Sequence, residues 1–230
     1  MEKPCSTDAS EIHDSPPPPA CFLIVYNVSK KHNIGTLARS AAIFGVKEFC
    51  LVGSQKFNTF GSHGSSDYVA FRHFTKLSEC CAYLKNEEGC EIIGVEIHDD
   101  AQPVHAKPFA GPTAFLLGNE GTGLSEKEME FCDKFVYISQ YGPGSASLNV
   151  VVAASIVLHE FAVWAGYRER AREGAKFDVG DRPPRTTRRG VVPLTEEETR
   201  LLKEGRRANR GTDVMMGEQG EEGGFFGDIL

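Results

Sequence analysis

Short runs of apolar residues alternate along the chain with segments in which apolar residues recur at helical spacing. The continuous runs predict five buried strands, over 21–28, 47–53, 91–97, 113–119 and 134–140. The helical spacing predicts four helices, over 33–45, 76–88, 126–133 and 148–173, and a Ser125–Glu128 capping box opens the third. The stretch 54–66 is rich in Gly and Ser and has no periodicity, so we expect a loop there.

This order of strands and helices is typical of α/β folds, in which helices cover both faces of a parallel sheet. We therefore expect a single α/β domain over 21–166, with an extension at each end. The first half of the helix predicted over 148–173 is apolar on nearly all sides. The terminal helix of a small domain normally buries only one face, so this helix is either fully internal or shared with a second subunit. We favour the second alternative, a homodimer interface over 148–166.

The two ends of the chain differ from the core in charge and composition. Residues 1–20 are acidic and end in a proline run, which predicts a disordered leader without the features of a secretory signal or a transit peptide. Residues 167–210 contain 13 Lys/Arg and 8 Asp/Glu, and a Thr195–Glu198 capping box predicts a short helix over 196–209. Residues 211–230 are rich in Gly and Glu, and we expect them to be disordered.

The overall composition narrows the class of protein. The 32 acidic and 25 basic side chains give a net charge of −7, which by itself argues against an RNA partner. The basic segment 167–210 removes that objection because it offers local phosphate contacts, although an arginine run is equally typical of a solvated or localisation segment. No apolar run approaches the roughly 20 residues of a membrane span.

The cysteines and histidines bear on location and on metal binding. The seven cysteines include no CxxC pair, and several lie inside apolar runs. This pattern indicates reduced core thiols in an intracellular protein, either cytoplasmic or nuclear. Neither residue type shows the spacing of metal ligands, so we expect no metal site.

Three segments at the predicted carboxyl ends of strands carry the candidate chemistry. They are N33-I-G-T-L-A-R39, L117-G-N-E-G-T-G-L-S125 and Q140-Y-G-P-G-S-A-S-L-N149. Parallel sheets bind ligands at this edge, and glycines let the backbone approach a ligand closely. The second segment has neither the G-x-G-x-x-G spacing of dinucleotide-binding loops nor the GK[ST] of a phosphate loop. Two glycine-rich loops at one edge suit a cofactor that is bound through its adenine and ribose.

Taken together and in this order, the three segments resemble motifs one, two and three of the SpoU (TrmH-type) branch of the SPOUT RNA methyltransferases. The resemblance covers about 23–165. It implies a parallel-sheet α/β knot, a deep trefoil knot in which the C-terminal segment threads through a loop, and it implies a homodimer. It also implies S-adenosyl-L-methionine as the cofactor and methyl transfer to a ribose 2′-hydroxyl in tRNA or rRNA.

The resemblance also implies roles for individual residues. Arg39 matches the proposed catalytic arginine of motif one, Asn33 the asparagine that opens that motif, and Glu120 the glutamate of motif two. The cofactor-binding positions that it implies are Leu117, Gly118, Asn119, Gly121, Ile138, Gln140, Ser147, Leu148 and Asn149. The candidate RNA contacts are Arg72, Arg182, Arg185, Arg188 and Arg189. The chain departs from the family pattern over 62–74, where Arg72 is only a partial match.

Several alternatives stay open at this point. Arginine is a poor base, so Arg39 either is a base whose proton is drawn off by neighbours or clamps the adjacent phosphate and stabilises the developing alkoxide. By pattern alone, Arg39 could be a solvated helix residue, Glu120 a loop-stabilising carboxylate, and Ser147 and Asn149 plain N-cap residues. The second class of function is a non-catalytic RNA-binding or assembly protein that keeps the fold. A third is methylation of a base or of a protein.

Overall fold

The computed structural model describes residues 16–26, 28, 31–54, 56–57, 61–119, 121–183, 192–193 and 200, without the side chains of 31–32, 56–57 and 192–193. The chain divides into two compact units, 1–191 and 192–230. In the second unit the structure describes only the short strand β11 (Val192–Pro193) and Arg200. The predicted helix over 196–209, apart from Arg200, and the predicted tail lie outside the described residues, as does the leader before Pro16. The fold below is that of the first unit.

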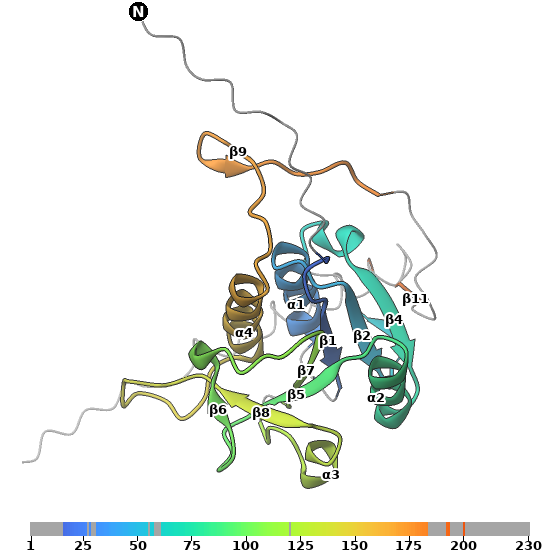
Figure 1. The fold of residues 1–230 in the computed structure, drawn as a ribbon. Helices are drawn as coiled ribbons and strands as arrows, with labels where there is room; N and C mark the ends of the chain where they lie inside the picture. The colour runs from blue at the N-terminus through green and yellow to red at the C-terminus, as the bar shows by residue number, and fades with distance from the viewer. Residues whose placement is uncertain are drawn as a thin grey trace, which may run out of the picture. The chain divides into compact units, whose positions relative to one another are not determined.

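Seven parallel strands form the central sheet of the first unit (Figure 1). Their order is β4 (Ala70–Phe74), β2 (Glu48–Val52), β1 (Cys21–Val25), β7 (Thr113–Leu117), β5 (Glu91–Val95), β8 (Lys134–Tyr137) and β6 (Gln102–Pro103). Every strand pair in this sheet is parallel. The five predicted strands are all present, which confirms the parallel α/β fold class.

Helices cover both faces of the sheet. Leu23 and Val25 of β1 face one core, which α1 (Lys31–Ile43) and α4 (Val150–Trp164) complete. Phe22 and Ile24 of the same strand face a second core with α2 (Leu77–Asn86), and Met129 of α3 (Glu126–Met129) packs against it. Successive residues of a strand point to opposite faces, which is why continuous apolar runs fill two cores at once. The α/β layering expected from the sequence is therefore present.

The remaining elements are short. They are β3 (Lys56–Phe57), the 3-10 turns η1 (Ser65–Tyr68) and η2 (Val104–Ala106), and the hairpin strands β9 (Arg172–Glu173) and β10 (Lys176–Phe177). None of the helices in the described part of the chain has the length and hydrophobicity needed to span a bilayer.

The helix predicted over 148–173 is shorter than expected, because α4 ends at Trp164. The Tyr167 N–H donates to the Ala162 carbonyl (3.0 Å) and the Gly166 N–H to the Val163 carbonyl (3.3 Å). These two bonds form a Schellman motif, and Gly166 adopts the left-handed conformation (φ 67°) that the motif requires. The prediction of a helix up to residue 173 is therefore wrong, because Gly166 ends it.

Strand β4 was not predicted from the sequence. It lies at the edge of the sheet beside β2, and of its five residues only Phe71 is buried. In this edge strand Arg72 and His73 interrupt the apolar residues, so it lacks the continuous apolar run by which the other long strands are found.

From the two central strands, β1 and β7, the chain proceeds toward opposite edges of the sheet. From β1 the chain passes through α1 to β2, whereas from the neighbouring β7 it passes through α3 to β8. In open α/β sheets, ligands bind in the crevice at the carboxyl ends of strands where the direction reverses. The direction reverses between β1 and β7, so we expect a ligand site at the carboxyl edge of the sheet, next to β7.

Candidate functional site

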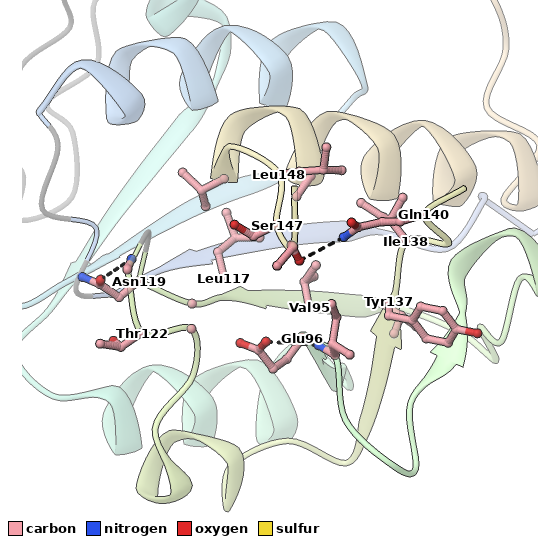
Figure 2. A pocket seen from close by; sticks show the side chains of 18 residues that line it. Val95, Glu96, Leu117, Asn119, Thr122, Tyr137, Ile138, Gln140, Ser147 and Leu148 are labelled. Atoms are coloured by element: carbon pink, nitrogen blue, oxygen red, sulfur yellow. Dashed lines mark hydrogen bonds between the residues drawn. The ribbon is translucent and has the colours of Figure 1, made fainter. Parts of the chain in front are cut away.

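A cavity of about 300 Å³ opens at the carboxyl ends of β5, β7 and β8 and at the start of α4 (Figure 2). Four stretches of chain line it. The lining residues are Val95, Glu96, Ile97, Leu117, Gly118, Asn119, Gly121, Thr122, Gly123, Val136, Tyr137, Ile138, Gln140, Ala146, Ser147, Leu148, Val150 and Ala153. Its volume is at the lower end of the range of small-molecule sites. Of the nine predicted cofactor-binding residues, only Asn149 does not line it.

The segment after β7 forms one wall of the cavity as a tight turn. The Asn119 N–H donates to the Gly123 carbonyl (2.9 Å), and the Gly123 N–H donates back to the Asn119 carbonyl (3.0 Å). The side-chain oxygen of Asn119 accepts from the Gly121 N–H (2.8 Å), which fixes the tip. We call residues 118–124 the glycine hairpin. Its Glu120, predicted as catalytic, lies outside the described residues.

At Gly118 the returning arm of this hairpin packs closely against the residue that follows β7. A Cβ at Gly118 would lie 2.6 Å from the carbonyl carbon of Gly123 and 2.8 Å from the Leu124 nitrogen, both backbone atoms. Backbone cannot yield as a flexible side chain can, so only glycine fits here.

The loop between β8 and α4 forms the opposite wall. Gln140 donates from Nε2 to the Ala146 carbonyl (3.3 Å), as the dashed line in Figure 2 shows, and this contact closes the loop on itself. Asn149 is the N-cap of α4, because its side chain accepts from the Val151 N–H (2.8 Å). Asn149 therefore caps α4, which is compatible with a role in cofactor support, and Ser147 lines the cavity.

The two described residues predicted as catalytic lie on α1 rather than in the cavity wall. Asn33 is buried in the first turn of α1. Arg39 is exposed in the middle of the helix, and among the described residues no hydrogen bond or ion pair holds its guanidinium. The residue after it, Ser40, is hydrogen-bonded to Ser155 of α4 (2.8 Å between the hydroxyl oxygens). Arg39 thus lies on a helix that is hydrogen-bonded to α4, and its exposed side chain is accessible to a large ligand.

The described candidate RNA contacts lie away from the cavity and have acidic partners. Arg72 on β4 pairs through Nε with Glu48 Oε2 (2.8 Å) and packs over the Tyr83 ring (4.1 Å from Cζ to the ring centroid). Burial opposes the charge of Arg72, but the Glu48 carboxylate outweighs this and raises the pKa of the guanidinium. Arg182 pairs with Asp67 of η1 (2.6 Å). Arg185, Arg188 and Arg189 lie outside the described residues.

The sequence interpretation missed the stretch that follows β5. Val95, Glu96 and Ile97 line the cavity because β5 pairs with both β7 and β8, so its carboxyl end lies between their loops. The available signal was an acidic residue near the carboxyl end of a strand that precedes the glycine-rich one. Among the described residues, no group of three or more His, Cys, Asp or Glu side chains could hold a metal ion.

The cavity suits a nucleoside-like ligand. The carboxyl ends of three strands meet at it, the glycine hairpin forms one wall, and both apolar and polar side chains line it. An adenosyl group needs a flat apolar slot, backbone partners for its ring nitrogens and acceptors for its hydroxyls. The residues present therefore fit S-adenosylmethionine.

The fold and the cavity together define an α/β protein with an adenosyl-type site at the carboxyl edge of its sheet. The sequence model of the SpoU rRNA Methylase family matches residues 20–159, and the chain belongs to this family. It is 30% identical over 146 residues to the 23S rRNA (guanosine-2'-O-)-methyltransferase RlmB of Acinetobacter baylyi, covering 61% of this chain and 58% of that enzyme. It thus spans less than two thirds of that relative.

Two further comparisons agree with this membership. The chain is 32% identical over 169 residues to the tRNA (guanosine(18)-2'-O)-methyltransferase of Thermus thermophilus, covering 72% of this chain and 81% of that enzyme. The SpoU methyltransferase AviRb from Streptomyces viridochromogenes, solved in complex with the cofactor AdoMet, superposes with a TM-score of 0.54 at 24% identity, covering 66% of this chain and 62% of that one. The likeness to the solved SpoU structures confirms the predicted α/β knot fold class.

Proposed function

We propose that this protein is an S-adenosyl-L-methionine-dependent RNA methyltransferase that methylates a ribose 2′-hydroxyl in tRNA or rRNA. The observation that carries the proposal is the cavity itself: two of the three family motifs, the glycine hairpin and the loop before α4, form its opposite walls. The names of the relatives support the reaction, because both are guanosine 2'-O-methyltransferases, one acting on 23S rRNA and the other on tRNA.

The chain's own residues then have to bind the cofactor, orient the RNA and help to deprotonate the 2′-hydroxyl. When bound, the cofactor supplies an electrophilic methyl group, so the protein need not provide a covalent intermediate. The glycine hairpin and the residues around Ile138 and Leu148 would hold the adenosyl part through backbone groups. Arg39 would contact the RNA, either clamping the phosphate next to the target ribose or assisting removal of the 2′-hydroxyl proton.

Two measurements test the proposal together. Isothermal titration calorimetry should detect binding of S-adenosylmethionine to the full chain. Incubation with unmodified tRNA and rRNA transcripts, followed by nuclease digestion and mass spectrometry, should reveal a 2′-O-methylated nucleoside. Cofactor binding with a methylated base instead would redirect the proposal to another RNA position. RNA binding without cofactor binding would establish the non-catalytic alternative.

We also propose that the protein acts as a homodimer through α4. Val152, Ile156 and Val163 lie along one side of this helix, and Val152 and Val163 are 47% and 53% exposed. Ile43 at the end of α1, the helix that packs against α4, is 64% exposed. A second copy of the chain would bury these apolar side chains.

Sedimentation equilibrium is expected to give twice the mass of the chain for the wild type and a monomer for the double variant Val152→Lys/Val163→Lys. Two lysines would have to be desolvated at the centre of the interface. Val179→Lys changes an exposed apolar residue outside α4 (73% exposed); it is the control and should remain a dimer. A monomeric wild type would rule out this assembly.

We further propose that the protein is intracellular. The described cysteines are free, and all of them except Cys132 are buried. Burial raises the pKa of Cys81 and of Cys90 to about 12. Such thiols behave as small apolar core residues, which is typical of proteins from a reducing compartment.

A further inference from the structure

Glu96 is the residue that joins the carboxyl end of β5 to the glycine hairpin. Its backbone N–H donates to the Val136 carbonyl (3.0 Å), which continues the pairing of β5 with β8. Its side chain turns toward the hairpin, where Oε2 accepts from the Leu124 N–H (2.8 Å). Oε1 accepts from the Ile97 N–H (3.1 Å). Both carboxylate oxygens are therefore oriented by backbone groups.

Gly123 leaves room for this carboxylate. A Cβ at Gly123 would lie far inside van der Waals contact with Glu96 Oε2, and Gly123 has a φ of 68° that side chains rarely adopt. The close approach indicates that the hairpin is shaped around the Glu96 carboxylate. The side chain is thus held in one place before any ligand arrives, which lowers the entropy cost of binding.

Glu96 also gives the cavity its charge. Among the described residues that line the cavity, it alone has an acidic side chain, and none has a basic one. In Figure 2 it lies below Val95, with its carboxylate on the side of Thr122. A carboxylate offers about four lone-pair positions, and the two backbone N–H groups occupy only two of them. The remaining positions can accept hydrogen bonds from a ligand.

We propose that Glu96 is a cofactor-binding residue whose carboxylate accepts hydrogen bonds from the ribose hydroxyls of S-adenosylmethionine. This rests on the proposed function. A vicinal diol presents two donors at a spacing that matches the two oxygens of a carboxylate. An acidic side chain that receives ribose hydroxyls beside a glycine-rich loop is a recurrent solution at the carboxyl edge of parallel sheets. In this chain the acid follows β5 and the glycine-rich loop follows the adjacent β7.

The test compares ligands with and without the hydroxyls. Calorimetry would measure the affinity of S-adenosylhomocysteine and of its 2′-deoxy and 3′-deoxy forms for the wild type and for Glu96→Gln. The wild type should lose roughly 10- to 100-fold in affinity when a hydroxyl is removed, because hydrogen bonds to a charged acceptor are strong. In Glu96→Gln this discrimination should fall to about threefold or less. Glu91→Gln, the same change at the other end of β5, should discriminate as the wild type does.

The discrimination ratio separates ligand contact from a purely structural role. A variant with a distorted hairpin would bind all three ligands less well by the same factor, and that result would overturn the proposal. Equal affinities of the wild type for all three ligands would also overturn it, whichever variants fold. A Glu96→Gln defect for S-adenosylmethionine but not for S-adenosylhomocysteine, which lacks the sulfonium charge, would show that the carboxylate senses the sulfonium instead and would overturn the proposal. A wild type that binds neither compound would refute the proposed function as well.

Discussion

Replacing Arg39 by alanine is expected to lower the rate of RNA methylation by about 100-fold or more and to leave the affinity for S-adenosylmethionine unchanged. The side chain is exposed on α1 and does not line the cavity, so its removal disturbs neither the core nor the cofactor site. A loss of activity without a loss of cofactor affinity would place Arg39 on the RNA side of the reaction. Single-turnover methylation of a tRNA or rRNA transcript, together with calorimetry, measures both quantities.

Two further variants sharpen this test. Arg39→Lys keeps a positive charge but not the planar fork of donors. If Arg39 clamps a phosphate, this variant should therefore retain part of the wild-type methylation rate. Lys134→Ala removes a half-exposed cation at the amino end of β8, where it pairs with Glu91 (2.8 Å), and should methylate normally. Wild-type rates in Arg39→Ala would contradict a catalytic role. Arg39 would then be a solvated helix residue, the alternative given in the sequence analysis. Parallel losses of cofactor and RNA binding would instead indicate a structural one.

Substituting Gly118 by alanine is expected to abolish measurable cofactor binding, a loss of at least 100-fold, and to destabilise the fold by about 1–3 kcal/mol. The new methyl group would lie 2.6 Å from the backbone of Gly123, so the whole glycine hairpin must move away from β7. That movement would carry the cavity wall with it. Calorimetry and thermal unfolding report the two effects separately.

Gly142→Ala is the matched control for this substitution. Gly142 belongs to the loop on the opposite wall, and a Cβ there meets no atom within 4 Å. Its affinity and melting temperature should therefore stay close to those of the wild type. If Gly118→Ala binds S-adenosylmethionine as the wild type does, the glycine hairpin is not the wall of the cofactor site.

The strands and cavity loops could be predicted because each depends on local sequence. The buried strands are continuous apolar runs, and the glycine-rich stretches at 117–125 and 140–149 follow them directly, so the parallel topology brings them to one edge. The edge strand β4 could not be found in this way, since its pairing with β2 decides its conformation. The end of α4 is not marked by a change to residues that disfavour helices, because the residues after Gly166 are good helix formers; the left-handed Gly166 ends the helix before them.

The site residues also divide into those that local sequence predicts and those that depend on the pairing of distant strands. Gly118, Ile138 and Ser147 lie in the cavity wall, as expected. Glu96 is harder to predict, because an acidic residue near the end of a strand does not by itself indicate a site; the placement of β5 between β7 and β8 brings it to the cavity. Arg72 is a different case, because its pairing with Glu48 depends on the register of β4 against β2, which no local pattern reveals.

The central position of β7 has a consequence for how the chain folds. β7 is the only link between β1 and β5 in the sheet of the described residues, yet both of its neighbours precede it in the chain. As the polypeptide leaves the ribosome, β1 must keep one hydrogen-bonding edge open, and β5 both of its edges, until residues 113–117 emerge and insert between them. Strand insertion between distant partners raises the contact order, so folding is expected to be slow. Three of the four stretches that line the cavity begin at the end of β7 or later in the chain, so the cavity can only form in the last stage of this assembly.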